Sequence, residues 1–228
     1  MPRLTFDRLS GGQAETVEFE PANLILAGWT GRDQAAVQHH IDELKELGVA
    51  PPSQTPVFYR TSAELCSQTG HLQVLGPDTS GEVEYVLLSF ADGLWFTVGS
   101  DQTDRKAEAM GVALSKQLCS KVMARSAWRL ADYADGWDGL AIRSWATIGG
   151  QKVVYQQAAL GSILSPAELI RKYTGGDSLP PGTVMMSGTP AAIGGIRPAA
   201  RFEMEIADGR SGQAIRHGYD IEVLPVIS

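Results

Sequence analysis

The chain has 228 residues, of which 43% are hydrophobic and 20% charged, a composition typical of a globular protein that buries a core. Its formal net charge is −7 and no Lys/Arg cluster stands out, which argues against nucleic acid or an anionic membrane as a partner. The apolar runs are too short to span a bilayer, and the first residues lack the apolar stretch of a secretory signal. Two cysteines, Cys66 and Cys119, suit a reducing compartment, so we expect a cytoplasmic protein.

Short β-rich runs separated by turn signals dominate the sequence. In chain order, the expected strands cover residues 24–27, 57–60, 82–90, 94–99, 140–148, 151–160, 183–188, 201–206 and 219–225. The expected helices cover about 33–47, part of 104–122, and 166–174. Gly149-Gly150 lies between two β-rich runs and predicts a hairpin. We therefore expect one β-rich α+β domain over residues 1–228, with a few surface helices.

Glu82 and Glu84 lie two residues apart in an expected strand. Strand side chains alternate between faces, so the two carboxylates point the same way, about 7 Å apart. Two such oxygen donors could bind one hard cation if a third ligand approached, and the alternative is a solvated strand face. A second Glu-x-Glu, Glu203-Met204-Glu205, is expected to be a solvated face of that kind.

Asp101 is the candidate for the third ligand. It follows an apolar run, where a strand passes into a loop, and sites are often built at such positions. The alternative is that Asp101 or Asp104 caps the helix that follows.

The expected helix at 33–47 places a histidine beside a carboxylate. Its apolar stripe consists of Val37, Ile41, Leu44 and Leu47. His40 and Glu43 fall together on the edge of that stripe, whereas His39 points to the opposite face. A buried His–Glu pair can act as a general base, and the alternative is an ordinary surface pair.

Three further features are candidates for binding an anion. The small-residue turn from Ser187 to Gly195 follows a short strand, and its backbone N–H groups around Gly188 and Thr189 could cradle a carboxylate or an oxyanion. Lys121 precedes an apolar-aromatic stretch and could face a negatively charged site. Arg60 follows an aromatic pair and is a candidate anchor for a substrate carboxylate.

These fragments, in this order, resemble the fumarylacetoacetate hydrolase superfamily. The matching segments are His40-Ile41-Asp42-Glu43, Glu82-Val83-Glu84, Ser100-Asp101-Gln102-Thr103-Asp104-Arg105, Lys121 and Ser187-Gly188-Thr189-Pro190. The resemblance covers about residues 24–225 and is closest over 164–195. It implies a mixed β-roll or barrel around a Mg²⁺-type ion and a homodimer.

The chain also departs from the pattern of that superfamily. GWTGRDQAAVQH replaces a glycine-tyrosine entry before the histidine, Ser-Asp replaces Asn-Asp, and Glu108 replaces a glutamine. The last turn reads Gly-Thr-Pro-Ala-Ala-Ile-Gly-Gly instead of Gly-Thr-Pro-x-Gly-Val-Gly. The sequence is therefore typical of a divergent branch.

The resemblance implies a role for each matching residue. Glu82, Glu84 and Asp101 would hold a divalent metal, Mg²⁺ or alternatively Mn²⁺ or Ca²⁺, that polarises a substrate carbonyl. His40, oriented by Glu43, would deprotonate a water, with Lys121 as a third catalytic residue. Arg105, Gly188 and Thr189 would bind the substrate.

We therefore expect a metal-dependent hydrolase that cleaves a C–C bond next to a carbonyl in a small oxo- or dicarbonyl acid. The same enolate can be reached by decarboxylation or tautomerisation of a 2-oxo acid, which is the first alternative. The second is a β-rich protein that binds a small ligand without catalysis, since fold alone does not establish function.

Overall fold

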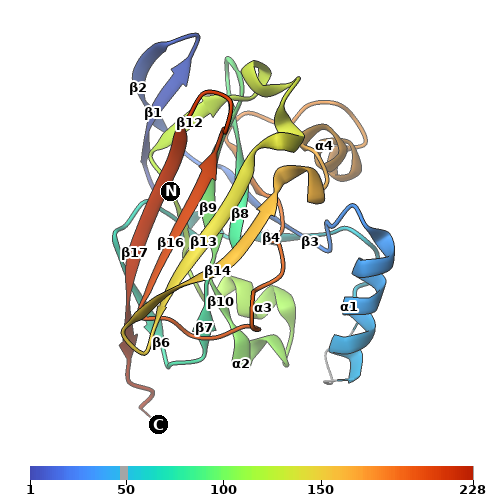
Figure 1. Cartoon of the computed structure of the whole chain (residues 1–228), viewed down its shortest axis with the longest axis vertical. Helices are drawn as coiled ribbons and strands as arrows, with labels where there is room; N and C mark the ends of the chain where they lie inside the picture. The colour runs from blue at the N-terminus through green and yellow to red at the C-terminus, as the bar shows by residue number, and fades with distance from the viewer. Residues whose placement is uncertain (47–50, 228) are drawn as a thin grey trace.

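Two β-sheets pack face to face and place four helices around their edges and ends in the described part of the chain (Figure 1). The computed structural model describes residues 1–46 and 51–227, and it leaves the side chains of residues 40, 43, 44 and 46 outside the description. The helices are α1 (Gln34–Glu46), α2 (Arg105–Glu108), α3 (Val112–Gln117) and α4 (Pro166–Thr174). Short 3-10 turns occur at Ala63–Leu65, Leu130–Tyr133, Trp137–Gly139 and Leu160–Ser162.

The larger sheet has ten strands, in the order β2-β1-β12-β9-β8-β15-β3-β4, with β11 beside β9 and β5 beside β11. Their bounds are β1 (Leu4–Ser10), β2 (Gln13–Phe19), β3 (Asn23–Gly28), β4 (Val57–Thr61), β5 (Cys66–Ser67), β8 (Val83–Phe90), β9 (Gly93–Asp101), β11 (Lys121–Met123), β12 (Ser126–Arg129) and β15 (Thr183–Met186). Parallel and antiparallel neighbours both occur, so the sheet is mixed.

The smaller sheet has five strands in the order β14-β13-β16-β17-β6 and lies in front of β8 and β9 in Figure 1. Its strands are β6 (His71–Leu75), β13 (Ala141–Ile148), β14 (Gln151–Ala159), β16 (Arg201–Ala207) and β17 (Ala214–Leu224). A separate pair joins β7 (Thr79–Ser80) to β10 (Thr103–Asp104).

Alternation along β8 builds two apolar cores, one on each face of the ten-stranded sheet. Tyr85 and Leu87 point into the larger core, which the five-stranded sheet covers. Val86 and Leu88 point to the opposite face, into a second core. Glu84 has the same parity as Val86, so its side chain lies on the face away from the five-stranded sheet.

The β-rich α+β fold predicted from the sequence is confirmed. Each expected strand corresponds to an observed one, and the predicted hairpin joins β13 to β14 through Gly149 and Gly150, whose φ angles are 58° and 79°. Positive φ at both turn residues is the geometry that glycine permits in a tight hairpin. Within residues 1–46 and 51–227, neither sheet closes into a barrel. The extent of the domain, 1–228 with motifs over 24–225, stays a prediction.

The helix expected over part of 104–122 is confirmed, but as two pieces. The segment forms two short helices, α2 and α3, separated by Gly111, and then the strand β11. Asp104 caps α2 by accepting a hydrogen bond from the Ala107 N–H, which confirms the capping alternative for that residue. The interruption at Gly111 brings α3 to the end of β9, where Lys116 contacts Asp101.

Two other helices begin at side-chain caps. Asp33 accepts hydrogen bonds from the N–H groups of Ala35 and Ala36 at the start of α1. Ser165 and Glu168 form a reciprocal capping box at the start of α4. No helix described here combines the length and the hydropathy needed to cross a membrane.

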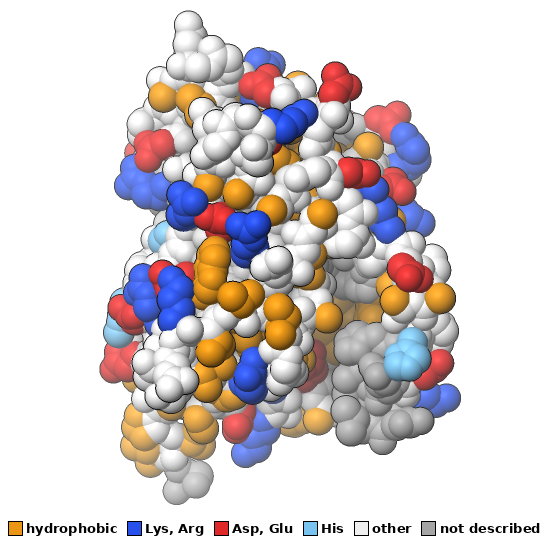
Figure 2. Space-filling model, viewed as in Figure 1, with side chains coloured by type: hydrophobic (Ala, Val, Ile, Leu, Met, Phe, Trp, Pro, Cys, Tyr) orange, Lys and Arg blue, Asp and Glu red, His pale blue; other side chains and the backbone are white. Residues whose placement is uncertain are grey.

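The outer face of the five-stranded sheet carries hydrophobic side chains between charged ones (Figure 2). Val154 on β14 is 44% exposed, and Ile193 and Ile196 in the loop beyond β15 are each 52% exposed. This surface is separate from Glu84, whose side chain lies on the face of the ten-stranded sheet that points away from the five-stranded one.

Candidate functional site: three buried carboxylates at the ends of β8 and β9

Glu82, Glu84 and Asp101 meet where β8 begins and β9 ends. The two strands are antiparallel, with Glu84 opposite Gly99 and the Asp101 N–H donating to the Glu82 carbonyl, so all three side chains emerge on one face. One carboxylate oxygen of each lies within 4.8 Å of the others. Asp101 is 1% exposed and Glu84 2%. The sequence prediction that these side chains come together is thus realised in the fold.

Two lysines reach the cluster from the segment after β9. Lys121 on β11 is fully buried, and its Nζ donates to the Gln102 carbonyl at 2.6 Å and lies 2.9 Å from Asp101 Oδ1. Lys116 on α3 donates to Asp101 Oδ2 at 2.5 Å and to Glu82 Oε2 at 3.2 Å. Asp101 is therefore flanked by two ammonium groups.

Arg105 holds the outer carboxylate of the cluster. Its Nη2 donates to Glu82 Oε1 at 2.9 Å, its Nη1 to Glu108 at 3.1 Å, and its Nε to the Ser80 hydroxyl at 2.7 Å. Glu108, which stands where the superfamily pattern has glutamine, thus pairs with Arg105. The predicted substrate-binding arginine is at the site, but its guanidinium is engaged by protein groups.

The turn after β15 holds the inner carboxylate. The Gly188 N–H donates to Glu84 Oε2 at 2.8 Å. Gly188 has φ +84°, and a Cβ there would lie 2.2 Å from Thr30 Oγ1, so both backbone conformation and space demand glycine. The N–H group that sequence reasoning assigned to a substrate oxyanion therefore supports a carboxylate of the cluster.

Gln156 on β14 ties this turn to the start of β8. Its Oε1 accepts from the Val83 N–H at 2.9 Å, and its Nε2 donates to Thr189 Oγ1 and to the Pro190 carbonyl, both at 2.6 Å. The Thr189 hydroxyl in turn donates to the Val83 carbonyl at 2.8 Å. The Thr189 hydroxyl thus links the turn to the start of β8.

The surroundings shift the pKa values of Glu82 and Glu84 in opposite directions. Burial, together with the charge of Asp101, raises the pKa of Glu84 well above its ordinary value. Burial acts on Glu82 in the same sense, but Arg105 and Lys116 outweigh it and lower the pKa of Glu82 to about 2. Burial disfavours charged Lys116, yet Asp101 and Glu82 raise its pKa above the ordinary value, so it stays an ammonium.

The donor set suits a divalent metal. All three side chains offer carboxylate oxygens, which are the ligands preferred by Mg²⁺, Mn²⁺ and Ca²⁺. Asp101 Oδ1 is buried and lies 2.9 Å from the Lys121 ammonium, so each oxygen of this carboxylate already faces a positive charge of the kind that a metal ion would supply. The raised pKa of buried Glu84 likewise indicates that the neighbouring positive charges do not fully compensate this carboxylate. The residues therefore fit such an ion.

The remaining predicted residues lie elsewhere or outside the description. Arg60 on β4 donates to Asn23 Oδ1 at the start of β3, so the structure does not bring it to the carboxylates. The backbone of α1 contains His40 and Glu43, but both side chains lie outside the described residues. Their assignment as a catalytic pair stays a prediction.

The solvated-face interpretation of the second Glu-x-Glu is wrong for Glu205. Glu205 is 5% exposed and pairs with Arg216 at 2.6 Å and with Arg143 at 3.5 Å. Glu203, which is more exposed, pairs with Lys152 at 2.8 Å. Both carboxylates pair with cations of the same five-stranded sheet, and no third acidic side chain joins them in a metal-like group among the described residues.

Sequence reasoning missed three residues near the cluster: Lys116, Gln156 and Tyr59. Burial raises the pKa of the Tyr59 hydroxyl, while a hydrogen bond from Trp29 and the charge of Lys116 act in the opposite sense. A lysine in a short helix and a glutamine in a strand carry no motif of their own. The sole signal for Lys116 was its place between Asp101 and Lys121.

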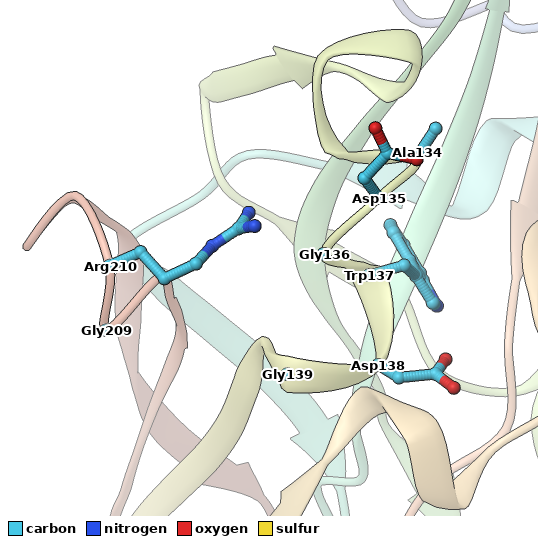
Figure 3. Close-up of a pocket in the computed structure, with 8 residues that line it drawn as sticks. All are labelled: Ala134, Asp135, Gly136, Trp137, Asp138, Gly139, Gly209 and Arg210. Atoms are coloured by element: carbon cyan, nitrogen blue, oxygen red, sulfur yellow. The ribbon is translucent and has the colours of Figure 1, made fainter.

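A surface pocket of about 550 Å³ lies apart from the carboxylates, between the turn around Trp137 and the β16–β17 connection. Figure 3 shows the Arg210 side chain pointing toward Gly136, while Asp138 points away from it. Asp138 binds Arg32 in two hydrogen bonds of 2.7 and 2.8 Å. The pocket contains none of the three clustered carboxylates, so we place the candidate site at the ends of β8 and β9.

A family model described as "Protein of unknown function (DUF2848)" matches residues 27–219, a range that includes the whole cluster. The chain belongs to the DUF2848 family. No protein of curated function matches it in sequence.

Solved structures share the fold of this DUF2848 chain at low identity. A crystal structure of Cg1458 with inhibitor superposes with a TM-score of 0.69 at 16% identity, over 92% of this chain and 81% of that chain. A 2-keto-3-deoxy-D-arabinonate dehydratase complexed with magnesium and 2,5-dioxopentanoate gives a TM-score of 0.63 at 14% identity, over 91% and 75%. These folds are of the fumarylacetoacetate hydrolase kind, which agrees with the fold that the sequence motifs implied.

Replacing Glu84 by glutamine should change how stability depends on pH. A carboxyl group with a raised pKa contributes stability below its unfolded value, near 4.5, and loses it as pH rises through the folded pKa. In EDTA, we expect the free energy of unfolding of the wild type to fall relative to Glu84→Gln as pH rises, by up to about 1.4 kcal/mol per pH unit.

Urea unfolding at steps from about pH 5 to 9 measures this difference. Glu18→Gln, an exposed carboxylate on β2, is the matched control and should follow the wild type. Parallel curves for wild type and Glu84→Gln would show that Glu84 ionises normally in the fold.

Proposed function

We propose that this chain is a metal-dependent enzyme that hydrolyses a C–C bond next to a carbonyl in a small oxo- or dicarbonyl acid. The observation that carries the proposal is the cluster of Glu82, Glu84 and Asp101, whose oxygens lie within 4.8 Å on a fold of the fumarylacetoacetate hydrolase kind. These three residues would hold the ion. When bound, a divalent metal would supply Lewis-acid polarisation of the substrate carbonyl.

Lys121 contributes a fixed positive charge. Its ammonium is fully buried, is held by the Gln102 carbonyl at 2.6 Å, and lies beside Asp101, so it cannot turn away into water. A preorganised charge in such a low-dielectric position stabilises negative charge that develops on a substrate oxygen. Gly188, through its N–H bond to Glu84, acts as a positioning residue.

His40, oriented by Glu43, is the proposed base that takes a proton from water. The backbone of α1 places the two residues one helical turn apart, and the helix packs through Ile41, which is 7% exposed. Arg60, Arg105 and Thr189 stay predictions as substrate-binding residues, and so does the homodimer.

Dehydration of a 2-oxo sugar acid is a second candidate function. It is favoured by the fold similarity to the dehydratase whose structure contains magnesium and 2,5-dioxopentanoate. Hydrolysis of an acylpyruvate and dehydration of such an acid share the need to stabilise an enolate, which the same cationic site would serve. Decarboxylation or tautomerisation of a 2-oxo acid makes the same demand.

Turnover on a small panel of acids tests the reaction class. We expect Mg²⁺-dependent loss of an acylpyruvate, abolished by EDTA, since the carbonyl needs polarisation. Loss of a 2-keto-3-deoxy sugar acid would favour the dehydratase, and CO₂ release from oxaloacetate above the metal-only background would favour the decarboxylase. Absence of turnover with all of these would contradict the proposed oxo-acid enzyme.

Asp101→Asn should weaken Mn²⁺ binding by more than the roughly 10–100-fold typical of an outer-shell change, because it removes a ligand charge. Isothermal titration calorimetry of metal-stripped protein measures the affinity. Glu203→Gln is the matched control and should bind like the wild type, since Glu203 pairs with Lys152 on the other sheet. Equal losses in both variants would contradict the ligand assignment.

His40→Ala should lose at least about 100-fold in kcat, the usual contribution of a general base, while it retains Mn²⁺ binding. His39→Ala should stay near the wild type, because the adjacent residue of a helix points about 100° away. A greater loss in His39→Ala would show that the wrong histidine has been assigned.

A further inference from the structure

Lys116 occupies the place that a metal ion would need. Its Nζ lies 2.5 Å from Asp101 Oδ2 and 3.2 Å from Glu82 Oε2, and the residue is 7% exposed. A divalent ion would approach carboxylate oxygens to about 2.0–2.6 Å. Two positive charges cannot share that space between Glu82 and Asp101, so the ammonium and the ion exclude each other.

The three cations at the cluster are anchored differently. Arg105 is also held by Ser80 and Glu108, and Lys121 is also held by the Gln102 carbonyl. Among the groups that the structure describes, the hydrogen bonds of the Lys116 ammonium go to Glu82 and Asp101. Lys116 is thus the cation that depends wholly on the carboxylates themselves.

We expect the Lys116 ammonium to be able to leave the carboxylates without a change in the fold. Its four-carbon stem is flexible, and α3 is a surface helix whose backbone need not move when the ammonium swings. The Glu108 carboxylate on α2 pairs with Arg105, which also holds Glu82, so a further carboxylate lies next to the cluster. A displaced ammonium therefore has a polar environment to enter.

We propose that Lys116 is a built-in counter-ion that occupies the cation position of the metal-free protein and is displaced when a divalent ion binds. The inference rests on the proposed metal site but adds a competitor to it. Lys116 neutralises carboxylates that would otherwise repel one another, and the ion must replace that interaction. Metal affinity is consequently lower than the three carboxylates alone would give.

Mn²⁺ titration of the full-length, metal-stripped protein tests this. Lys116→Met should bind Mn²⁺ at least about tenfold more tightly than the wild type, because breaking a buried ion pair is costly and the variant has none to break. Lys106→Met, an exposed lysine on the neighbouring helix α2, is the matched control and should bind like the wild type. Equal or weaker Mn²⁺ binding by Lys116→Met would overturn the proposal.

A measurement on the wild type keeps the test independent of how that variant folds. In a crystal soaked with Mn²⁺, the Lys116 Nζ should have left Glu82 and Asp101, while Lys121 stays on the Gln102 carbonyl. A Mn²⁺ ion bound with Lys116 still in place would overturn the displacement. If Mn²⁺ affinity is unchanged in Lys116→Met while metal-dependent turnover is present, this inference fails and the proposed function stands. If neither protein binds Mn²⁺, both fail.

Discussion

Three carboxylates within 4.8 Å repel one another, and two of them are almost fully buried, so the site exists only because cations compensate them. Arg105, Lys116 and Lys121 supply that compensation, each from the segment that follows β9. The departure of that segment from one continuous helix has a physical reason here. Two short helices and a strand bring three cations to one point, which a single straight helix could not do.

The position of the Glu84 carboxylate depends on the backbone around the cluster as well as on the neighbouring charges. Glu84 depends on the N–H of a glycine at which any side chain would be strained, and Gln156 fixes the turn that presents this N–H to β8. Gln156 belongs to the five-stranded sheet, whereas the carboxylates belong to the ten-stranded one. The packing of the two sheets therefore sets the geometry of the site, although the site itself lies on the outer face of the larger sheet.

The sequence predicted the strands and the carboxylates because both follow local rules. Alternation placed Glu82 and Glu84 on one face, and the apolar run before Asp101 marked the end of a strand. The hairpin of β1 and β2 went unpredicted, since β2 is polar and mostly exposed and lacks the apolar alternation of a core strand. Lys116 could not be predicted either. Its role comes from the fold of α3 over the strand ends, and a lysine in a short helix is usually solvated.

The hydrogen bond between Glu84 and Gly188 joins residues 104 positions apart in the chain. During synthesis, Glu82, Glu84 and Asp101 leave the ribosome long before the turn that completes their setting. An incomplete chain can therefore display the three acids without the backbone donor that orients one of them. In this architecture the organised cluster of carboxylates therefore forms only once the turn after β15 has been synthesised, and any binding of a metal to the oriented cluster would follow that step.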